Sequence, residues 1–372
     1  MAELRTFLEK CYADLNQWRS LREIYIVLGN ESCDLDSAVS AIAYGFLLFK
    51  KNELENSMNQ TVFPVLNVDR KHFPMRLEHC YLMNQLDINL EKLIFRSDIN
   101  FEELIEAVND MKITVKTYLV DHHVLSRNDD ILRQTVCRIF DHRTLDEKNF
   151  CPGELRIEPV GSCATIISDE IFKEDFEIWN KDIAYLVYCT ILMDTKGLRP
   201  KKGKTTALDM EIASKLERKF GFNKSNLYDK LKDLRCSTCH LTIDEMLIKD
   251  LKCSGSIAFS RIHVLAETFI AKDCAMDSLK EFCSKKKVSM IILIGSEANS
   301  KMKDMGLFFD TNNERFIRKF CQKLRENGMR DLPNILENFV VFKFEFQKLT
   351  RKEIIPIILN IYEELKTELT SH

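Results

Sequence analysis

Hydrophobic and polar positions follow two kinds of pattern along the 372-residue chain. Short apolar runs rich in β-branched residues stand between longer segments with helical periodicity, which is typical of parallel strands buried on both faces. Four such runs predict strands in the first half: IYIVL (24–28), TYLV (117–120), VCRIF (136–140) and LVYCTILM (186–193). We therefore expect an α/β domain with a doubly wound, mainly parallel sheet.

A second, smaller α/β pattern begins near residue 222. It follows a basic, Gly- and Pro-containing segment at 195–206 and a predicted helix at 207–221. Further predicted elements are helices near 225–234 and 275–287, strands at 256–264, 288–295 and 338–346, and a final helix from residue 352. These patterns predict two domains, 1–221 and 222–372.

Composition limits the classes of function. With 45% hydrophobic and 30% charged residues, the chain can bury a sizeable core. A formal net charge of -3 gives no general electrostatic reason to expect nucleic acid or an anionic membrane as a partner. The N-terminal segment lacks the apolar stretch of a signal peptide, and no run of 18 apolar residues occurs. We expect a soluble, cytoplasmic protein.

The cysteines predict thiols packed in a core rather than a disulfide framework. There are 13, an odd number, and several stand in apolar surroundings such as LVYCTILM. One segment, CSTCH (236–240), has the C-x-x-C-H spacing of a covalent haem site. Because no export signal accompanies it, ordinary surface residues are the favoured interpretation, and a haem site or zinc half-site is the alternative.

Acidic residues follow all four predicted strands of the first half: Asp34 and Asp36 after the first, then Asp121, Asp141 and Asp194. Ligands of open α/β sheets bind outside the carboxyl ends of the strands, so this pattern would gather five aspartates around one crevice. Carboxylates at that density require a cation, and Mg²⁺ or Mn²⁺ suits oxygen ligands. For any single aspartate, a turn or helix cap is the better explanation. The DHH and DHR segments, which add imidazole, favour a metal site.

Five motifs in order resemble the motif series of the DHH phosphoesterase superfamily: GNESCDLDS, YLVDHHVLS, IFDHRTLD, EPVGSCATI and TILMDTKGL. The resemblance is closest to the exopolyphosphatase branch that includes the animal Prune proteins, and more distant to the manganese-dependent inorganic pyrophosphatases. In the second half, LTIDEMLIKDLK (241–252) and LTRKEIIPII (349–358) resemble the phosphate-binding elements of the smaller C-terminal domain of these branches. The resemblance implies hydrolysis of a phosphoanhydride or phosphoester at a two-metal centre in the cleft between two domains.

The resemblance also implies a ligand set for two divalent ions, Mg²⁺ or Mn²⁺. One ion would be held by Asp34 and Asp121, and the other by Asp36, Asp121, His142 and Asp194, so that Asp121 bridges the pair. The pyrophosphatases have a histidine at the start of the first motif, where this chain has Asn30. An amide carbonyl makes the ligand set richer in oxygen, which favours Mg²⁺.

The resemblance also implies that three further residues lie close to the reacting phosphate or support the residues that do. Asp141 would orient the His142 ring. His122 would steer the nucleophile or contact substrate, and a structural role for its imidazole is the alternative. Arg143 stands where the pyrophosphatases have a histidine; a guanidinium can stabilise phosphoryl oxygens but cannot donate a proton to a leaving group.

Substrate phosphates would meet two more groups of residues. Gly161 and Ser162 lie at a probable helix start, where free backbone N–H groups can receive an anion; an ordinary helix cap is the alternative. Lys252, Arg351 and Lys352 correspond to phosphate-binding cations of the family's exopolyphosphatases. On composition alone, these three would be solvated surface residues.

The main hypothesis is therefore a metal-dependent exopolyphosphatase that acts on short-chain inorganic polyphosphate or pyrophosphate. Hydrolysis of cyclic nucleotides is the second candidate activity. An alternative of a different class is a signalling or scaffold protein with protein partners, whose site binds metal and nucleotide but turns over poorly. Arg143 and Asn30 favour that alternative, and the five intact acidic positions count against it.

Overall fold

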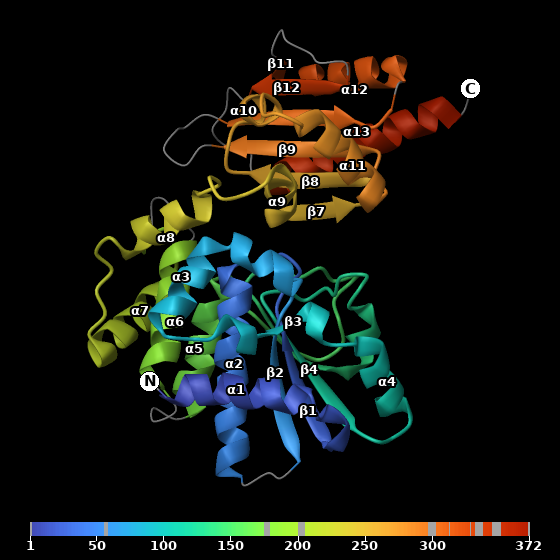
Figure 1. Cartoon of the computed structure of the whole chain (residues 1–372). Helices are drawn as coiled ribbons and strands as arrows, with labels where there is room; N and C mark the ends of the chain where they lie inside the picture. Colours follow the sequence, from blue (N-terminus) through green and yellow to red (C-terminus); the bar gives the residue numbers. More distant parts are fainter. Residues whose placement is uncertain are drawn as a thin grey trace. The chain divides into compact units, whose positions relative to one another are not determined.

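The structure is a computed structural model, and it describes residues 2–55, 59–174, 179–199, 205–296, 303–311, 313–327, 329–331, 338–343 and 351–370. The chain forms two compact units, Met1–Arg235 and Cys236–His372, and each contains its own sheet (Figure 1). The domain boundary predicted after residue 221 falls within the first unit and stays a prediction. No helix in the described ranges is long and apolar enough to cross a membrane.

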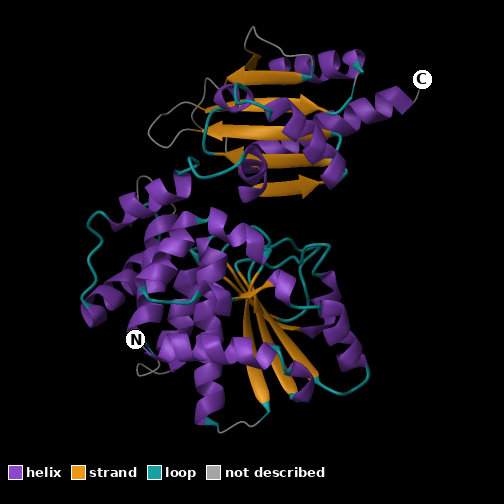
Figure 2. Cartoon of the chain, viewed as in Figure 1, coloured by secondary structure: helices purple, strands orange, loops and turns teal. Residues whose placement is uncertain are grey.

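The first unit is built on a six-stranded sheet in the order β3-β2-β1-β4-β5-β6 (Figure 2). Its strands are β1 (Glu23–Leu28), β2 (Gln60–Leu66), β3 (Ile94–Phe95), β4 (Thr114–Val120), β5 (Val136–Asp141) and β6 (Glu154–Ile157). Every neighbouring pair is parallel. The predicted doubly wound parallel sheet is confirmed.

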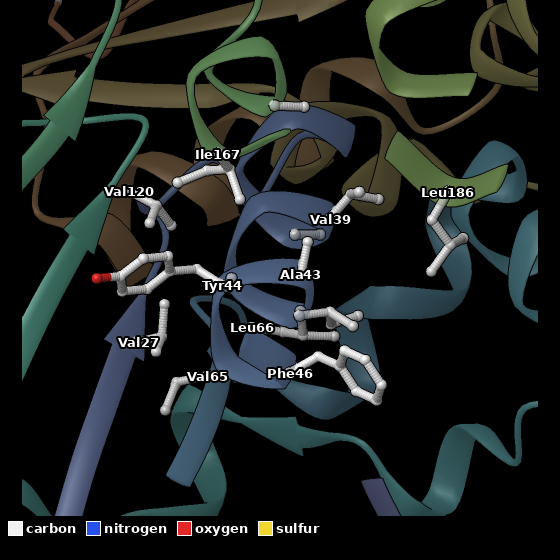
Figure 3. Close-up of a cluster of buried hydrophobic side chains, with 14 of the residues drawn as sticks. Val27, Val39, Ala43, Tyr44, Phe46, Val65, Leu66, Val120, Ile167 and Leu186 are labelled. Carbon is white, nitrogen blue, oxygen red and sulfur yellow. The ribbon is translucent and has the colours of Figure 1, made fainter. Parts of the chain in front are cut away.

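Helices precede, separate and follow these strands, and they supply much of the core. They are α1 (Ala2–Leu15), α2 (Leu35–Leu54), α3 (Leu77–Gln85), α4 (Phe101–Asn109), α5 (Cys163–Glu174), α6 (Lys181–Asp194), α7 (Ala207–Phe220) and α8 (Leu227–Cys236). The first three turns of α2 are buried throughout. Figure 3 shows Tyr44 of α2 beside Val27 of β1 and Val120 of β4, within one buried apolar cluster. Helix α2 therefore anchors the loop that precedes it, which carries Asp34, to the sheet.

The strand predicted at 186–193 is wrong, because these residues form most of α6. A continuous apolar run suits a helix buried on all sides as well as a central strand. Helix α6 is such a helix: it packs against α2, α5 and α7, and residues from Leu186 to Met193 are all buried. Its start carries a helix signal, because the Asn180 side chain accepts a hydrogen bond from the Asp182 amide at 2.7 Å.

The second unit contains a mixed sheet in the order β11-β12-β10-β9-β8-β7. Its strands are β7 (Leu251–Ser254), β8 (Ile257–Ile262), β9 (Met290–Ser296), β10 (Lys303–Phe309), β11 (Arg330–Asp331) and β12 (Phe339–Lys343). Its helices are α9 (Ile243–Lys249), α10 (Ala266–Ile270), α11 (Ala275–Lys286), α12 (Glu314–Glu326) and α13 (Arg351–Thr370). The predicted second α/β domain is confirmed, with 344–346 of its last predicted strand outside the described residues. The cleft between domains as the site stays a prediction.

Candidate metal centre

The acids of the first motifs lie at the switch point of the parallel sheet. Strand order runs from β1 through β2 to β3 on one side and through β4, β5 and β6 on the other. Doubly wound sheets bind ligands outside the carboxyl ends of their strands at such a point. Asp34 and Asp36 follow β1, and Asp121 follows β4. The fold therefore places three acids where this architecture binds ligands.

Asp36, Asp121 and His142 form a group that could hold a metal ion, because one ligand atom from each lies within 4.8 Å of the others. His142 Nε2 lies 3.4 Å from Asp121 Oδ1 and 3.9 Å from Asp36 Oδ2. The other ring nitrogen, Nδ1, lies 3.0 Å from the Val160 carbonyl oxygen and donates to it, which directs Nε2 toward the acids. Two carboxylates and an imidazole suit a divalent cation such as Mg²⁺ or Mn²⁺.

Asp121 is held with one carboxylate oxygen directed at this group. Its Oδ2 accepts hydrogen bonds from the Asn30 amide and the Ser37 hydroxyl, both at 2.7 Å. Its Oδ1 is buried and faces the Arg143 guanidinium at 2.8 Å and His142 Nε2 at 3.4 Å. The residue also has a φ of 62°, a left-handed conformation that aspartate tolerates better than most residues. A buried carboxylate oxygen that already faces a cationic side chain suits a centre of positive charge.

Asp36 is held by the start of α5. Its carboxylate accepts from the Ser162 hydroxyl at 2.8 Å, from the Cys163 amide at 2.7 Å and from the Ala164 amide at 2.8 Å. A helix N-terminus favours an anion, and here the anion is a side chain of the protein. The neighbouring Gly161 amide donates to Asp209 at 2.9 Å. The role of Gly161 and Ser162 in binding substrate phosphate stays a prediction.

Asp34 and Asp194, the other two predicted acidic ligands, stand outside this group. Asp34 caps α2, accepting from the Ser37 amide at 3.1 Å, and Asp194 is the last residue of α6. Burial, followed by the negative charge of Asp36, raises the pKa of Asp194 well above its usual range. Burial and the charge of Asp121 raise the pKa of Asp34. Neither residue belongs to the group of ligand atoms within 4.8 Å of one another, so the roles of Asp34 and Asp194 as metal ligands stay predictions.

The pKa values of the clustered side chains are shifted in different directions. Burial and the neighbouring Asp121 carboxylate raise the pKa of Asp36 to about 6. For Asp121 burial acts in the same direction, but the His142 ring 3.4 Å away and the charge of Arg143 lower the pKa to about 2. Burial disfavours the charged His142 ring, yet Asp121 and Asp36 raise its pKa to about 9. The site therefore favours positive charge, which a divalent cation would supply.

Arg143 and Asp141 lie beside this centre. The Arg143 guanidinium is 2.8 Å from Asp121 Oδ1 and 3.2 Å from Asp141 Oδ1, and it also donates to the Asp121 carbonyl oxygen. The structure corrects the partner predicted for Asp141. The ring next to Asp141 is that of His123, with Nδ1 at 2.6 Å from Oδ2, whereas the Val160 carbonyl orients the His142 ring.

His122 and Asn30 contact the same segment of chain. The Nδ1 of His122 lies 3.0 Å from the Val120 carbonyl oxygen, and burial lowers the pKa of the ring. The side-chain oxygen of Asn30 accepts from the Ser32 backbone amide at 3.0 Å, while the side-chain nitrogen of Asn30 donates to the Asp121 carboxylate. Their predicted roles in catalysis and in metal binding stay predictions.

The cations predicted to bind phosphate belong to the second unit. Lys252 is exposed on β7. Arg351 and Lys352 begin α13, and their side chains lie outside the described part of the structure. Their roles stay predictions.

The cysteines are free thiols, as predicted. Cys239 and His240 of the CSTCH segment are exposed. Among the described residues, the group that could hold a metal consists of Asp36, Asp121 and His142 and includes no cysteine.

Sequence reasoning missed three side chains that support the acids. Ser37 donates to Asp121, His123 contacts Asp141, and Asp209 accepts from the Gly161 amide. Ser37 and His123 stand within the quoted motifs, so their position was a usable signal. Asp209 is the third residue of α7 and forms a capping box with Thr206. In the sequence, this pattern indicates only an ordinary helix start.

Fold and site together define a two-unit α/β protein with a candidate metal group at the switch point of its parallel sheet. No protein-family model matches the chain. The exopolyphosphatase PRUNE1 of Bos taurus is 32% identical to it over 326 residues, which cover 86% of this chain and 67% of that protein. The chain therefore belongs to the DHH phosphoesterase superfamily, in the exopolyphosphatase branch that contains the Prune proteins.

More distant relatives share the same architecture. A Clostridium acetobutylicum protein assigned as a manganese-dependent inorganic pyrophosphatase is 27% identical over 234 residues, covering 62% of this chain and 66% of that protein. The crystal structure of a Methanococcus jannaschii protein assigned to the family II inorganic pyrophosphatases matches with a TM-score of 0.60 at 19% identity, and covers 91% of this chain and 99% of that one. This structural match shows a shared fold.

Proposed function

We propose that the chain is a metal-dependent phosphoanhydride hydrolase that releases phosphate from short-chain polyphosphate or pyrophosphate. The observation that carries the proposal is the convergence of Asp36, Asp121 and His142 on one point at the switch of the sheet. It is supported by relatives named as an exopolyphosphatase and as a manganese-dependent pyrophosphatase.

In this proposal the site holds two divalent ions, Mg²⁺ or Mn²⁺. Asp121 would bridge them, with Asp34 on one side and Asp36, His142 and Asp194 on the other. Bound in a pair, such ions lower the pKa of water and stabilise both the attacking and the leaving oxygen of a phosphoryl transfer. The buried Oδ1 of Asp121 and the mutual repulsion of the acids fit this occupancy.

Residues around the acids would act on substrate directly. The charge of Arg143 is fixed at any pH of interest, so it would stabilise phosphoryl oxygens without serving as a proton donor. His122 has a lowered pKa and donates from Nδ1, which leaves the lone pair of its neutral ring on Nε2. That nitrogen is suited to orient an attacking water. Lys252, Arg351 and Lys352 would bind the further phosphates of a chain substrate.

The test is phosphate release from tripolyphosphate, pyrophosphate and cyclic AMP with Mg²⁺ or Mn²⁺, for the wild type and for Asp194→Ala. We expect release from the first two substrates, and a loss on the order of 10²-fold or more in the variant because one ion loses a carboxylate. Equal release by both proteins would point to a contaminant or to a different site. Metal binding without release of phosphate would support the signalling alternative instead.

Asn30→His should change which metal supports activity. The substitution places an imidazole next to Asp121, and nitrogen ligands favour Mn²⁺ and Co²⁺ over Mg²⁺. We expect the ratio of kcat/KM with Mn²⁺ to that with Mg²⁺ to rise several-fold, about 1 kcal/mol in differential stabilisation. Asn30→Gln, which keeps an uncharged side-chain amide, is the control. An unchanged ratio in the histidine variant would place Asn30 outside the metal centre.

A further inference from the structure

His123, the second histidine of the DHH segment, joins two parts of the site that are 18 residues apart. It is buried, with 6% of its surface exposed. One ring nitrogen, Nδ1, lies 2.6 Å from Asp141 Oδ2, and the other, Nε2, lies 2.9 Å from the backbone amide of Asp146. Asp141 itself is completely buried. Both ring nitrogens of His123 are therefore engaged by specific partners.

The partner at Nε2 fixes the position of the ring proton. A backbone N–H can only donate, so the Nε2 of His123 must accept the hydrogen bond from Asp146. The ring proton then sits on Nδ1 and is donated to the Asp141 carboxylate. Asp141 Oδ2 thus accepts from a ring whose own direction is set by the contact of its opposite edge with Asp146.

The second oxygen of Asp141 holds the segment that carries a metal-group histidine. Asp141 Oδ1 accepts from the His142 amide at 2.7 Å and from the Arg143 amide at 3.2 Å. It also lies 3.2 Å from the Arg143 guanidinium. The two oxygens of one carboxylate therefore connect the His123 ring to the backbone of His142 and Arg143.

We propose that His123 is a positioning residue for the metal centre. Through Asp141 it fixes the peptide from which the His142 ring faces Asp36 and Asp121 and the Arg143 guanidinium faces Asp121. Partners of this kind, one step removed from a ligand, typically alter metal affinity by about 10- to 100-fold when removed. The inference rests on the proposed function, because it assigns His123 a role in the same centre.

A purely structural role for His123 makes a different prediction, because it would depend on the Nε2 side of the ring rather than on Nδ1. The Asp146 amide bonds to Nε2, and the His123 carbonyl oxygen accepts from the Cys151 amide at 3.0 Å. These contacts tie the 142–151 segment to the core. If this tie were the whole role, keeping the acceptor at Nε2 would preserve the site.

Two substitutions separate the roles. In His123→Asn the side-chain amide nitrogen lies as many bonds from the backbone as Nδ1, so it can still donate to Asp141. In His123→Gln the terminal amide reaches the position of Nε2 and can still accept from Asp146, but no donor remains at Nδ1. His240→Gln, at an exposed histidine of the second unit, is the control for replacing a histidine by glutamine outside the site. Mn²⁺ binding by titration calorimetry and kcat/KM for tripolyphosphate are measured for each protein.

We expect His123→Gln to weaken Mn²⁺ binding by about 10- to 100-fold and to lower kcat, with His123→Asn losing clearly less. The reverse order, or equal losses, would overturn the inference while the wild type's own metal binding and phosphate release leave the proposed function standing. A wild type that binds no Mn²⁺ would overturn both. Should His123→Gln fail to fold, His123→Asn still decides, because a loss above about tenfold there contradicts the inference.

Discussion

Asp121→Asn is expected to abolish metal-induced stabilisation and to lower kcat/KM for tripolyphosphate by at least about 10³-fold, roughly 4 kcal/mol. The side chain faces His142 at 3.4 Å, and its buried Oδ1 lies 2.8 Å from the Arg143 guanidinium. An amide is nearly the same size but carries no charge. Because Asp121 is the proposed bridge between two ions, both would lose a ligand at once.

The measurement is the midpoint of thermal unfolding at increasing Mn²⁺. A ligand present at about 100 times its dissociation constant stabilises the folded protein by about 2.7 kcal/mol, so the wild type should unfold at a higher temperature. Asp14→Asn is the matched control, since Asp14 is buried in the same unit and contacts Thr61 at the amino end of β2, away from the site. An Asp121→Asn protein that keeps the wild-type response to Mn²⁺ would exclude Asp121 from the metal centre.

The sequence predicted the sheet where local pattern and tertiary environment agree. The runs ending in Leu28, Val120 and Phe140 became parallel strands, because apolar residues bounded by turns suit strands covered by helices on both faces. The run at 186–193 is equally apolar but forms α6. Its surroundings are other helices rather than neighbouring strands, and that difference depends on packing that no short window of sequence contains.

The acids of the site were predicted for the same local reason, since each ends or follows an element. The side chains that hold these acids in place were not predicted, because they come from distant parts of the chain. Ser162, which donates to Asp36, is 126 residues away in sequence. The start of α5 illustrates the limit: its free amides predicted a bound anion, yet a substrate phosphate and an aspartate side chain satisfy them equally. Only the folded arrangement shows that Asp36 occupies them.

Asp209→Asn is expected to destabilise the first unit by about 2–4 kcal/mol. The Asp209 carboxylate is completely buried and accepts hydrogen bonds on both oxygens. Thr165 donates to Oδ1 at 2.6 Å, and the Thr206 amide and hydroxyl donate to Oδ2 at 2.7 and 2.8 Å; the Gly161 amide is shared between Oδ2 at 2.9 Å and Oδ1 at 3.2 Å. An NH₂ group on the Oδ2 side would leave the Thr206 and Gly161 amides facing a donor, and on the Oδ1 side it would force the Thr165 hydroxyl to reverse; either way these donors lose a buried charged acceptor.

The effect should be visible in denaturant unfolding followed by tryptophan fluorescence, because both tryptophans, Trp18 and Trp179, belong to the first unit. Asp110→Asn, at an exposed aspartate after α4, should stay within about 0.5 kcal/mol of the wild type. A loss below about 1 kcal/mol in Asp209→Asn would contradict the argument. The expected loss would mean that Asp209 fixes the turn at Gly161, and with it the start of α5 whose amides hold Asp36.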